Sequence, residues 1–221
     1  MKAMILAAGR GERMRPLTDE LPKPLLKAGP HRLIEYHLYQ LADAGFHEVV
    51  INVAWLGEKI IEQLGNGERY GLRICYSNEG DQALETAGGI FKALPLLGDQ
   101  PFLVVNGDVW SDYPYAKLKD FELSGLAHLV LVNNPEHNPQ GDFAIKDNRV
   151  HNQGEQKFTF SGIGVYSKDF FAGLSPGKSP LAPMLREAIE RGQVTGEVYQ
   201  GHWLDIGTPQ RLQQLAQLLR E

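Results

Sequence analysis

Short apolar runs alternate with helix-like segments over the first 132 residues, and this alternation constrains the fold more than any other feature. Runs that suit buried strands occupy residues 3–6, 48–53, 72–76, 101–105 and 127–132. Between them, apolar residues recur at helical spacing over residues 31–41, 58–64, 86–94 and, more weakly, 115–123. Strands that alternate with helices pair in parallel, and the connecting helices cover both faces of the sheet. The pattern predicts an α/β fold with a Rossmann-like, three-layer core.

The second half of the chain has a different pattern. Two short segments, 142–145 and 149–151, flank the dipeptide Asp147-Asn148 and are typical of a hairpin. A longer strand with two glycines is then expected over residues 157–166. It should be followed by a helix at 181–191, a strand at 194–200 and a helix at 209–220. With no convincing linker, we expect one domain, 1–221, whose mixed, mostly parallel sheet carries a small, partly antiparallel lobe.

Charge and cysteine content narrow the choice of partner. The 22 Lys and Arg residues are outnumbered by 27 Asp and Glu residues, and the formal charge is −5. A chain of that sign is a poor general binder of nucleic acid, so its cations should act locally on a small anion. A single cysteine, Cys75, fits a reducing compartment, and no apolar run is long enough to cross a membrane. We expect a cytoplasmic protein with no nucleic-acid or membrane partner, whose oligomeric state the sequence leaves open.

A long irregular segment follows the first strand. Residues 8–30 show neither a helical nor a strand period and contain four prolines and three glycines. Such a loop inside a compact domain is usually functional, and its glycines let backbone N–H groups approach phosphate oxygens closely. Three arginines add guanidinium groups, and Lys23 stands between two prolines that stiffen its backbone. Met14 occupies the third glycine position of a dinucleotide fingerprint, so this segment predicts a different kind of phosphate site.

Three further segments place polar residues where ligands of α/β sheets bind. The apolar run 101–105 leads into Asn106-Gly107-Asp108, which puts a carboxylate at the carboxyl edge of the sheet. Asp205 precedes the last helix, for which Thr208 is the expected N-cap, and Thr86 is expected to cap the helix at 86–94. Magnesium needs few protein carboxylates when phosphate oxygens and water complete its shell. No histidine pair has metal-ligand spacing.

Several of these motifs together resemble one family. The stretch LAAGRGERMRPLT at 6–18, followed by PKPL at 22–25, is similar to the opening of the sugar-1-phosphate nucleotidyltransferases. The resemblance continues at LETAGGI (84–90), VVNGDV (104–109) and GHWLDIGT (201–208), so it covers most of the chain. It implies the nucleotide-diphospho-sugar transferase fold, with a nucleotide-binding half at about 1–110 and a sugar-phosphate-binding half at about 111–221.

The resemblance also implies roles for particular residues. It assigns Arg15, Lys23 and Asp108 to catalysis and Asp108 with Asp205 to magnesium. The residues that it places against the nucleotide are Leu6, Ala7, Ala8, Gly9, Gly11, Glu85, Thr86, Gly88 and Asn106. Those that it places against the sugar phosphate are Asp142, Ser161, Gly162 and Lys157. Many relatives have Glu-Lys-Pro where this chain has Glu155-Gln156-Lys157, so which lysine binds the sugar phosphate stays open.

The reaction implied is attack of a sugar 1-phosphate oxygen on the α-phosphorus of a nucleoside triphosphate, with loss of pyrophosphate. The segments are most similar to the branch of the family that joins UTP to N-acetylmuramate 1-phosphate in peptidoglycan recycling. A guanylyltransferase acting on mannose 1-phosphate is the alternative within the family. Two other classes stay open: a non-catalytic nucleotide-binding regulatory protein, and a metal-dependent glycosyltransferase, which would require a short Asp-x-Asp motif.

Overall fold

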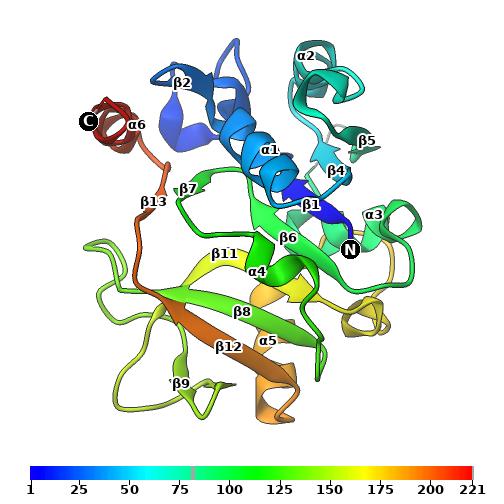
Figure 1. Cartoon of the computed structure of the whole chain (residues 1–221), viewed down its shortest axis with the longest axis vertical. Helices are drawn as coiled ribbons and strands as arrows, with labels where there is room; N and C mark the ends of the chain where they lie inside the picture. The colour runs from blue at the N-terminus through cyan, green and yellow to red at the C-terminus, as the bar shows by residue number, and fades with distance from the viewer. Residues whose placement is uncertain (81–82, 221) are drawn as a thin grey trace.

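The computed structural model describes residues 1–80 and 83–220 and contains a nine-stranded sheet (Figure 1). The strand order is β5-β4-β1-β6-β11-β8-β12-β10-β9. In chain order these strands are β1 (Ala3–Leu6), β4 (Glu48–Val53), β5 (Arg73–Asn78), β6 (Phe102–Asn106), β8 (Ala127–Val132), β9 (Ala144–Lys146), β10 (Arg149–His151), β11 (Thr159–Tyr166) and β12 (Val194–Tyr199). All except β10 and β11 run in the same direction, which confirms the mixed, mostly parallel sheet.

The first strand, β1, is apolar throughout, and both of its faces pack in the core. In β1, Ala3 and Ile5 belong to one core cluster and Met4 to the other, as expected when successive side chains point to opposite faces. The first cluster includes side chains of α1 (Leu33–Asp43), α2 (Gly57–Leu64) and α4 (Ala116–Lys119). The second includes those of α3 (Glu85–Leu97) and α5 (Leu181–Glu190). Figure 1 shows α4 in front of the strands and α5 behind them, and the three-layer prediction is confirmed.

The expectation that β8 continues the parallel ladder was wrong. β11 lies between β6 and β8 and pairs antiparallel with both, while β12 returns parallel to β8. The pairing of β11 with β8 shifts register between Phe160 and Ile163, where Gly162 has a φ of 80°. The hairpin about Asp147-Asn148 is confirmed as β9–β10, and both turn residues have positive φ.

The irregular segment contains more structure than its sequence suggests. Two 3-10 turns, η1 (Glu12–Met14) and η2 (Lys23–Leu25), precede a hairpin of β2 (Lys27–Ala28) and β3 (His31–Arg32). The first helix therefore begins at Leu33 instead of residue 31. Its N-cap residue Arg32 donates its backbone N–H to the Glu35 carboxylate at 2.8 Å. Other corrections are local: α4 is a single turn, and α3 begins after Leu84, so Thr86 is not its cap.

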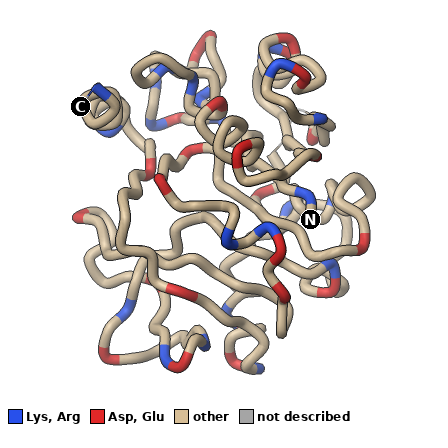
Figure 2. Tube along the Cα trace, in the orientation of Figure 1, with Lys and Arg blue, Asp and Glu red and all other residues tan. Residues whose placement is uncertain are grey.

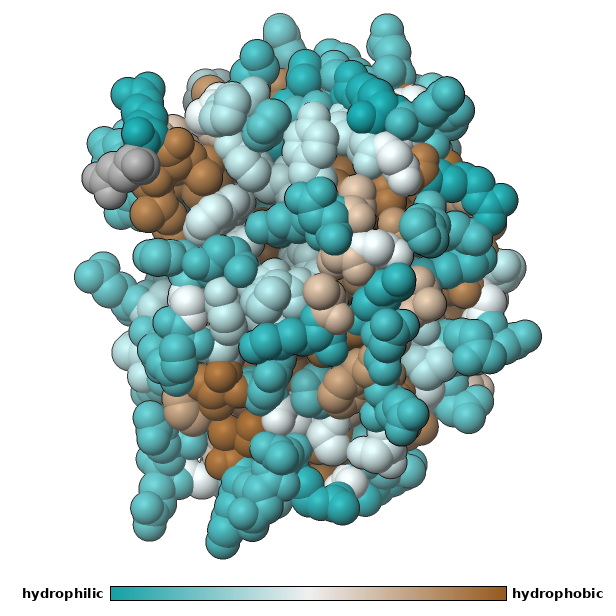
Figure 3. All heavy atoms as spheres, in the orientation of Figure 1, coloured by the Kyte–Doolittle hydropathy of each residue, from teal (hydrophilic) through white to brown (hydrophobic). Residues whose placement is uncertain are grey.

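The C-terminal segment returns to the first half of the chain. After β12 the chain forms β13 (Trp203–Asp205), which pairs antiparallel with β7 (Val109–Ser111) directly after the Asp108 turn. Helix α6 (Pro209–Leu218) follows, and Thr208 Oγ1 accepts the Arg211 N–H at 3.4 Å, which confirms the predicted cap. Figure 3 shows a compact apolar patch beside α6 at the upper left. The remaining short turns are η3 (Glu68–Tyr70) and η4 (Lys168–Phe171).

Charged residues of both signs are spread over the molecule. Figure 2 shows blue and red segments interspersed along the trace without a broad basic face. Within the described residues, no helix is long and apolar enough to span a bilayer.

Candidate active site

A cavity of about 500 Å³ lies at the carboxyl ends of the parallel strands. Polar residues from three strand ends line it: Asn52 near the end of β4, Glu79 just after β5, and Asn106 at the end of β6. This is the edge at which open α/β sheets bind ligands. The residues expected to contact the nucleotide that also line this cavity are Leu6, Ala7, Ala8, Gly9, Gly11, Glu85, Thr86 and Asn106.

The glycine-rich loop forms one wall of the cavity. Gly11 is left-handed, with a φ of 67°, and its carbonyl accepts the Thr18 hydroxyl at 2.8 Å. A Cβ at Gly11 would lie 3.1 Å from Thr18 Cγ2 and 3.2 Å from Lys23 Cβ, so the loop needs a glycine there. Met14 is fully buried in a third apolar cluster with Leu26, Leu33, Ile206 and Leu215. A large apolar residue at this position attaches the loop to α1 and α6.

Lys23 and Asp108 form an ion pair at the cavity. Lys23 Nζ lies 2.9 Å from Asp108 Oδ2, with the lysine side chain 9% exposed and the carboxylate 47% exposed. Lys23 is the first residue of η2, between Pro22 and Pro24, and this rigid turn directs its side chain inward. A buried ammonium beside a partly exposed carboxylate places a fixed positive charge where a phosphate could bind.

A buried polar network supports the opposite wall, and the sequence had not indicated it. Asn52 accepts the Ala7 N–H at 2.8 Å through Oδ1 and donates to Glu79 Oε1 at 2.7 Å. Glu79 accepts the Leu84 N–H at 2.7 Å through Oε2. A Cβ at Gly89 would lie 2.4 Å from Glu79 Oε1, so α3 approaches the network closely. The network therefore fixes the glycine-rich loop and the start of α3 relative to each other. The rule that ligands lie at strand ends would have found both side chains.

Glu85 has an unusual backbone at the start of α3. Its φ is 61°, a left-handed conformation that residues other than glycine and asparagine rarely adopt. Both Glu85 and Thr86 line the cavity beside the Glu79 network. Strained residues concentrate at ligand sites, which makes Glu85 a candidate ligand contact.

The two predicted magnesium ligands lie on adjacent backbone segments. Asp205 is opposite Val109 in the β13–β7 ladder, and the Ile206 N–H donates to the Asp108 carbonyl at 2.7 Å. The Asp205 carboxylate is held by His137, with Nε2 3.1 Å from Oδ1, and by Arg211. In the described part of the chain no group of three His, Cys, Asp or Glu side chains could hold a metal. Asp108 lines the cavity and Asp205 does not. Two aspartates on adjacent strands still suit magnesium, which takes its other ligands from phosphate and water.

The arginines of the loop are placed differently from the prediction. Arg15, predicted to be catalytic, is not among the cavity-lining residues; its Nε pairs with Asp19 at 2.6 Å and its side chain is 63% exposed. Arg13 does line the cavity. A Cβ at Gly207 would lie 3.2 Å from both Arg13 Nη2 and Asp205 Oδ2, so these two groups flank the same glycine. The sequence could not separate the two arginines because the turn η1 determines which one faces inward.

The residues predicted for the sugar phosphate do not line this cavity. Asp142 accepts the Phe160 N–H at 2.8 Å, and the Ser161 hydroxyl donates to the Val130 carbonyl at 2.6 Å. Lys157 is half-buried, and its carbonyl accepts the Asn134 amide at 2.9 Å. Asp142 and Ser161 thus support the backbone around the β11 irregularity.

Two of the glycines that were predicted to contact a substrate permit close packing. A Cβ at Gly162 would lie 2.5 Å from Asn106 Nδ2, so Gly162 packs directly against a cavity residue. A Cβ at Gly88 would lie 2.3 Å from the Gly177 carbonyl oxygen. Gly88 therefore allows the 177–179 segment to pack on α3, and it does not line the cavity.

One titratable group is buried behind the Asp108 turn. His37 of α1 is 1% exposed, and its Nδ1 lies 3.1 Å from the Tyr115 hydroxyl. Burial lowers the pKa of His37 to about 4, although the Val109 backbone and the Asp108 charge act in the opposite direction. The imidazole is therefore neutral at physiological pH.

Comparison with known proteins identifies the family. The nucleotidyl transferase family model matches residues 2–221. N-acetylmuramate alpha-1-phosphate uridylyltransferase from Neisseria meningitidis serogroup B is 51% identical, over 97% of this chain and 96% of that protein. The protein of the same name from Caulobacter vibrioides is 34% identical over 94% of this chain and 92% of its own length. Mannose-1-phosphate guanyltransferase from Yarrowia lipolytica is also 34% identical, but this chain covers only 61% of it.

A solved structure has the same fold. A putative glucose-1-phosphate thymidylyltransferase from Bacillus anthracis superposes with a TM-score of 0.88 at 23% identity, over 100% of this chain and 96% of that one. The family model and the relatives, taken together, show that the chain belongs to the nucleotidyl transferase family and is an enzyme of the sugar-1-phosphate nucleotidyltransferase type.

Proposed function

We propose that the protein joins UTP to N-acetylmuramate 1-phosphate and releases pyrophosphate. The observation that carries the proposal is the Lys23–Asp108 pair at the strand-end cavity, in a chain 51% identical to a uridylyltransferase for that sugar phosphate along nearly its whole length. The reaction would serve peptidoglycan recycling in the cytoplasm, where the single cysteine, Cys75, stays unpaired.

The proposed reaction needs no general base. A phosphate monoester has a second pKa of about 6, so the sugar phosphate is mostly a dianion at neutral pH. One of its oxygens forms a bond to the α-phosphorus of UTP, and the bond from that phosphorus to the bridging oxygen breaks. Pyrophosphate leaves with the electron pair. The enzyme has to bring two anions together and stabilise the charge on the reacting phosphate.

The cavity residues have distinct parts in this scheme. The Gly9–Gly11 backbone would hold the triphosphate, and Lys23 would neutralise the α-phosphate. Asp108 and Asp205 would hold magnesium, which supplies further charge stabilisation when bound. Because Arg13 lines the cavity and Arg15 pairs with Asp19, we assign the phosphate-binding role predicted for Arg15 to Arg13 instead.

The two halves of the chain would divide the substrates. Of the cavity-lining residues, all except Gly207 come from the first 110 residues, so we propose about 1–110 as the nucleotide-binding half. Glu85 and Thr86, supported by the Asn52–Glu79 pair, would contact the nucleoside. The sugar phosphate would bind over about 111–221, near the Gly162–Asn106 contact, where Asp142, Ser161 and Lys157 remain candidates.

A substrate matrix tests the proposal. UTP, GTP, dTTP and CTP would each be combined with N-acetylmuramate, mannose and glucose 1-phosphates, and pyrophosphate release would be measured. UTP with N-acetylmuramate 1-phosphate should give the highest kcat/KM. A preference for GTP with mannose 1-phosphate would contradict the substrate assignment, and release of nucleoside diphosphate would contradict the reaction.

The metal assignment has a separate test. Asp108→Ala and Asp205→Ala should each nearly abolish pyrophosphate release while circular dichroism shows a folded protein. Asp112→Ala is the control, because Asp112 lies at the other end of β7 from Asp108 and its carboxylate is hydrogen-bonded to Tyr199 and His202. Near-normal turnover in either of the first two variants would overturn the two-aspartate assignment.

A further inference from the structure

A second cavity, lined in part by Leu25 of η2, is strongly basic. It has a volume of about 590 Å³ and shares no lining residue with the active-site cavity. Four elements each direct one cation into it: Lys27 of β2, Arg32 of β3, Lys59 of α2 and Arg69 of η3. We propose that this basic pocket is a second binding site, which takes the phosphate group of a small anion.

The two arginines are held in place by a buried carboxylate. Glu35 is 7% exposed and accepts hydrogen bonds from Arg69 Nη2 at 3.1 Å and from the Tyr70 hydroxyl at 2.9 Å. Arg32 Nη1 lies 3.5 Å from the same oxygen, Oε1. Burial raises the pKa of Glu35, but the Arg32 backbone, Tyr70 and the two arginines lower it further, so the net pKa is lowered. Glu35 stays ionised and orients both guanidinium groups before any ligand binds.

The charges in the pocket do not cancel. The pocket is lined by four cations and one exposed carboxylate, Glu62. Even when Glu35, which pairs with Arg32 and Arg69, is counted as well, two positive charges remain in a chain whose formal charge is −5. Lys59 Nζ donates to the Glu20 carbonyl, and within residues 1–80 and 83–220 no carboxylate pairs with Lys27 or Lys59. Uncompensated cations kept together in one cavity repel each other unless an anion binds.

The donor set selects phosphate chemistry. Two oriented guanidinium groups can each form paired hydrogen bonds with phosphate oxygens, and two ammonium groups add point charges. The only large apolar residues that line the pocket are Leu21 and Leu25, so among the described residues no aromatic ring offers a stacking surface for a base. Inorganic phosphate and the phosphate ester of a small metabolite share this chemistry, and a titration with each separates them.

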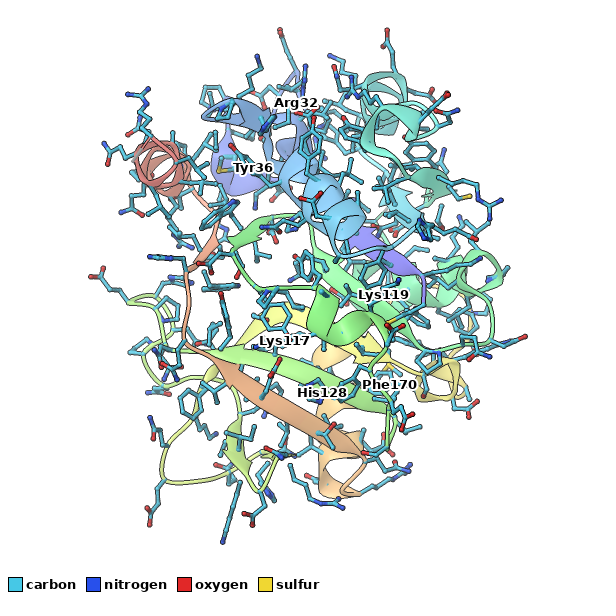
Figure 4. The ribbon with its side chains drawn as sticks, in the orientation of Figure 1. Arg32, Tyr36, Lys117, Lys119, His128 and Phe170 are labelled. Atoms are coloured by element: carbon cyan, nitrogen blue, oxygen red, sulfur yellow. The ribbon has the colours of Figure 1, made fainter. Side chains whose placement is uncertain are left out.

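The variants are chosen to leave the fold intact. Lys27→Gln removes an exposed cation from the pocket, and Glu62→Gln removes its exposed carboxylate. Lys117→Gln is the matched control: Lys117 is also exposed, and Figure 4 places it on α4, away from Arg32 at the top of the molecule. Lys23→Gln weakens anion binding at the active site and leaves the basic pocket unchanged.

Isothermal titration calorimetry with inorganic phosphate and, separately, glucose 6-phosphate tests the proposal. We expect a binding component that survives Lys23→Gln, weakens about fivefold in Lys27→Gln and tightens severalfold in Glu62→Gln. Lys117→Gln should match the wild-type protein. Binding of phosphate alone, of the ester alone or of both would support the site and show which kind of phosphate ligand it takes. If no component survives Lys23→Gln, or if Lys27→Gln and Glu62→Gln leave the affinity unchanged, the proposal is wrong.

Discussion

Replacing His37 by methionine should remove a pH-dependent part of the protein's stability. His37 is 1% exposed, and burial lowers its pKa from 6.5 to about 4. Between these two values the unfolded chain binds a proton at this position and the folded protein does not. The contribution of His37 to the free energy of unfolding is therefore complete above the pKa of the unfolded state. It is lost as the pH falls towards the pKa of the folded state.

The size of the effect follows from the two pKa values. A difference of about 2.5 pKa units corresponds to roughly 3 kcal/mol of unfolding free energy in total. Lowering the pH from about 7.5 to about 5 should remove roughly 2 kcal/mol of it, because the unfolded histidine is then almost fully protonated. Domains are typically stable by only about 5–15 kcal/mol, so this loss is measurable. The variant also loses the Tyr115 contact, which costs about 1 kcal/mol at every pH.

Urea unfolding followed by tryptophan fluorescence measures the effect. The free energy of unfolding would be determined across this pH range, without divalent cations, for the wild-type protein, His37→Met and His47→Gln. His47 is exposed, so its variant should keep the wild-type pH dependence. His37→Met should be less stable near pH 7.5 and should equal or exceed the wild type near pH 5. An unchanged pH slope in His37→Met would refute the reasoning.

Three further substitutions have expected outcomes. Lys23→Gln removes the buried cation beside the cavity and should lower kcat about 100-fold or more in a pyrophosphate-release assay. The melting temperature of this variant should stay within a few degrees of the wild-type value. Gly162→Ala adds a Cβ 2.5 Å from Asn106 Nδ2 at a φ of 80°, and should cost about 2–4 kcal/mol in chemical denaturation while raising KM for substrate. Thr208→Ala removes the acceptor of the Arg211 N–H and should cost about 1 kcal/mol with little effect on kcat.

Much of the candidate site could be predicted from local sequence. The Lys23 position follows from two prolines that stiffen one turn, and Asn106 and Asp108 follow from the end of an apolar strand. The same reasoning applied to β4 and β5 would have found Asn52 and Glu79. The choice between Arg13 and Arg15 could not be made in this way, because two residues of a short 3-10 turn point in different directions that no periodicity records.

The sequence by itself determined most element types, the position of the glycine-rich loop after β1 and the resemblance to the family. Runs of apolar residues make strands that can be buried on both faces, and motif spacing along the chain is a local property that can be read directly. Only the tertiary structure decided that β11 lies between β6 and β8, and that β13 pairs with β7 and brings Asp205 beside Asp108. It also decided that Lys27, Arg32, Lys59 and Arg69 meet in one cavity. These arrangements depend on pairing between segments far apart in the chain, and the local pattern of a strand does not specify its neighbour.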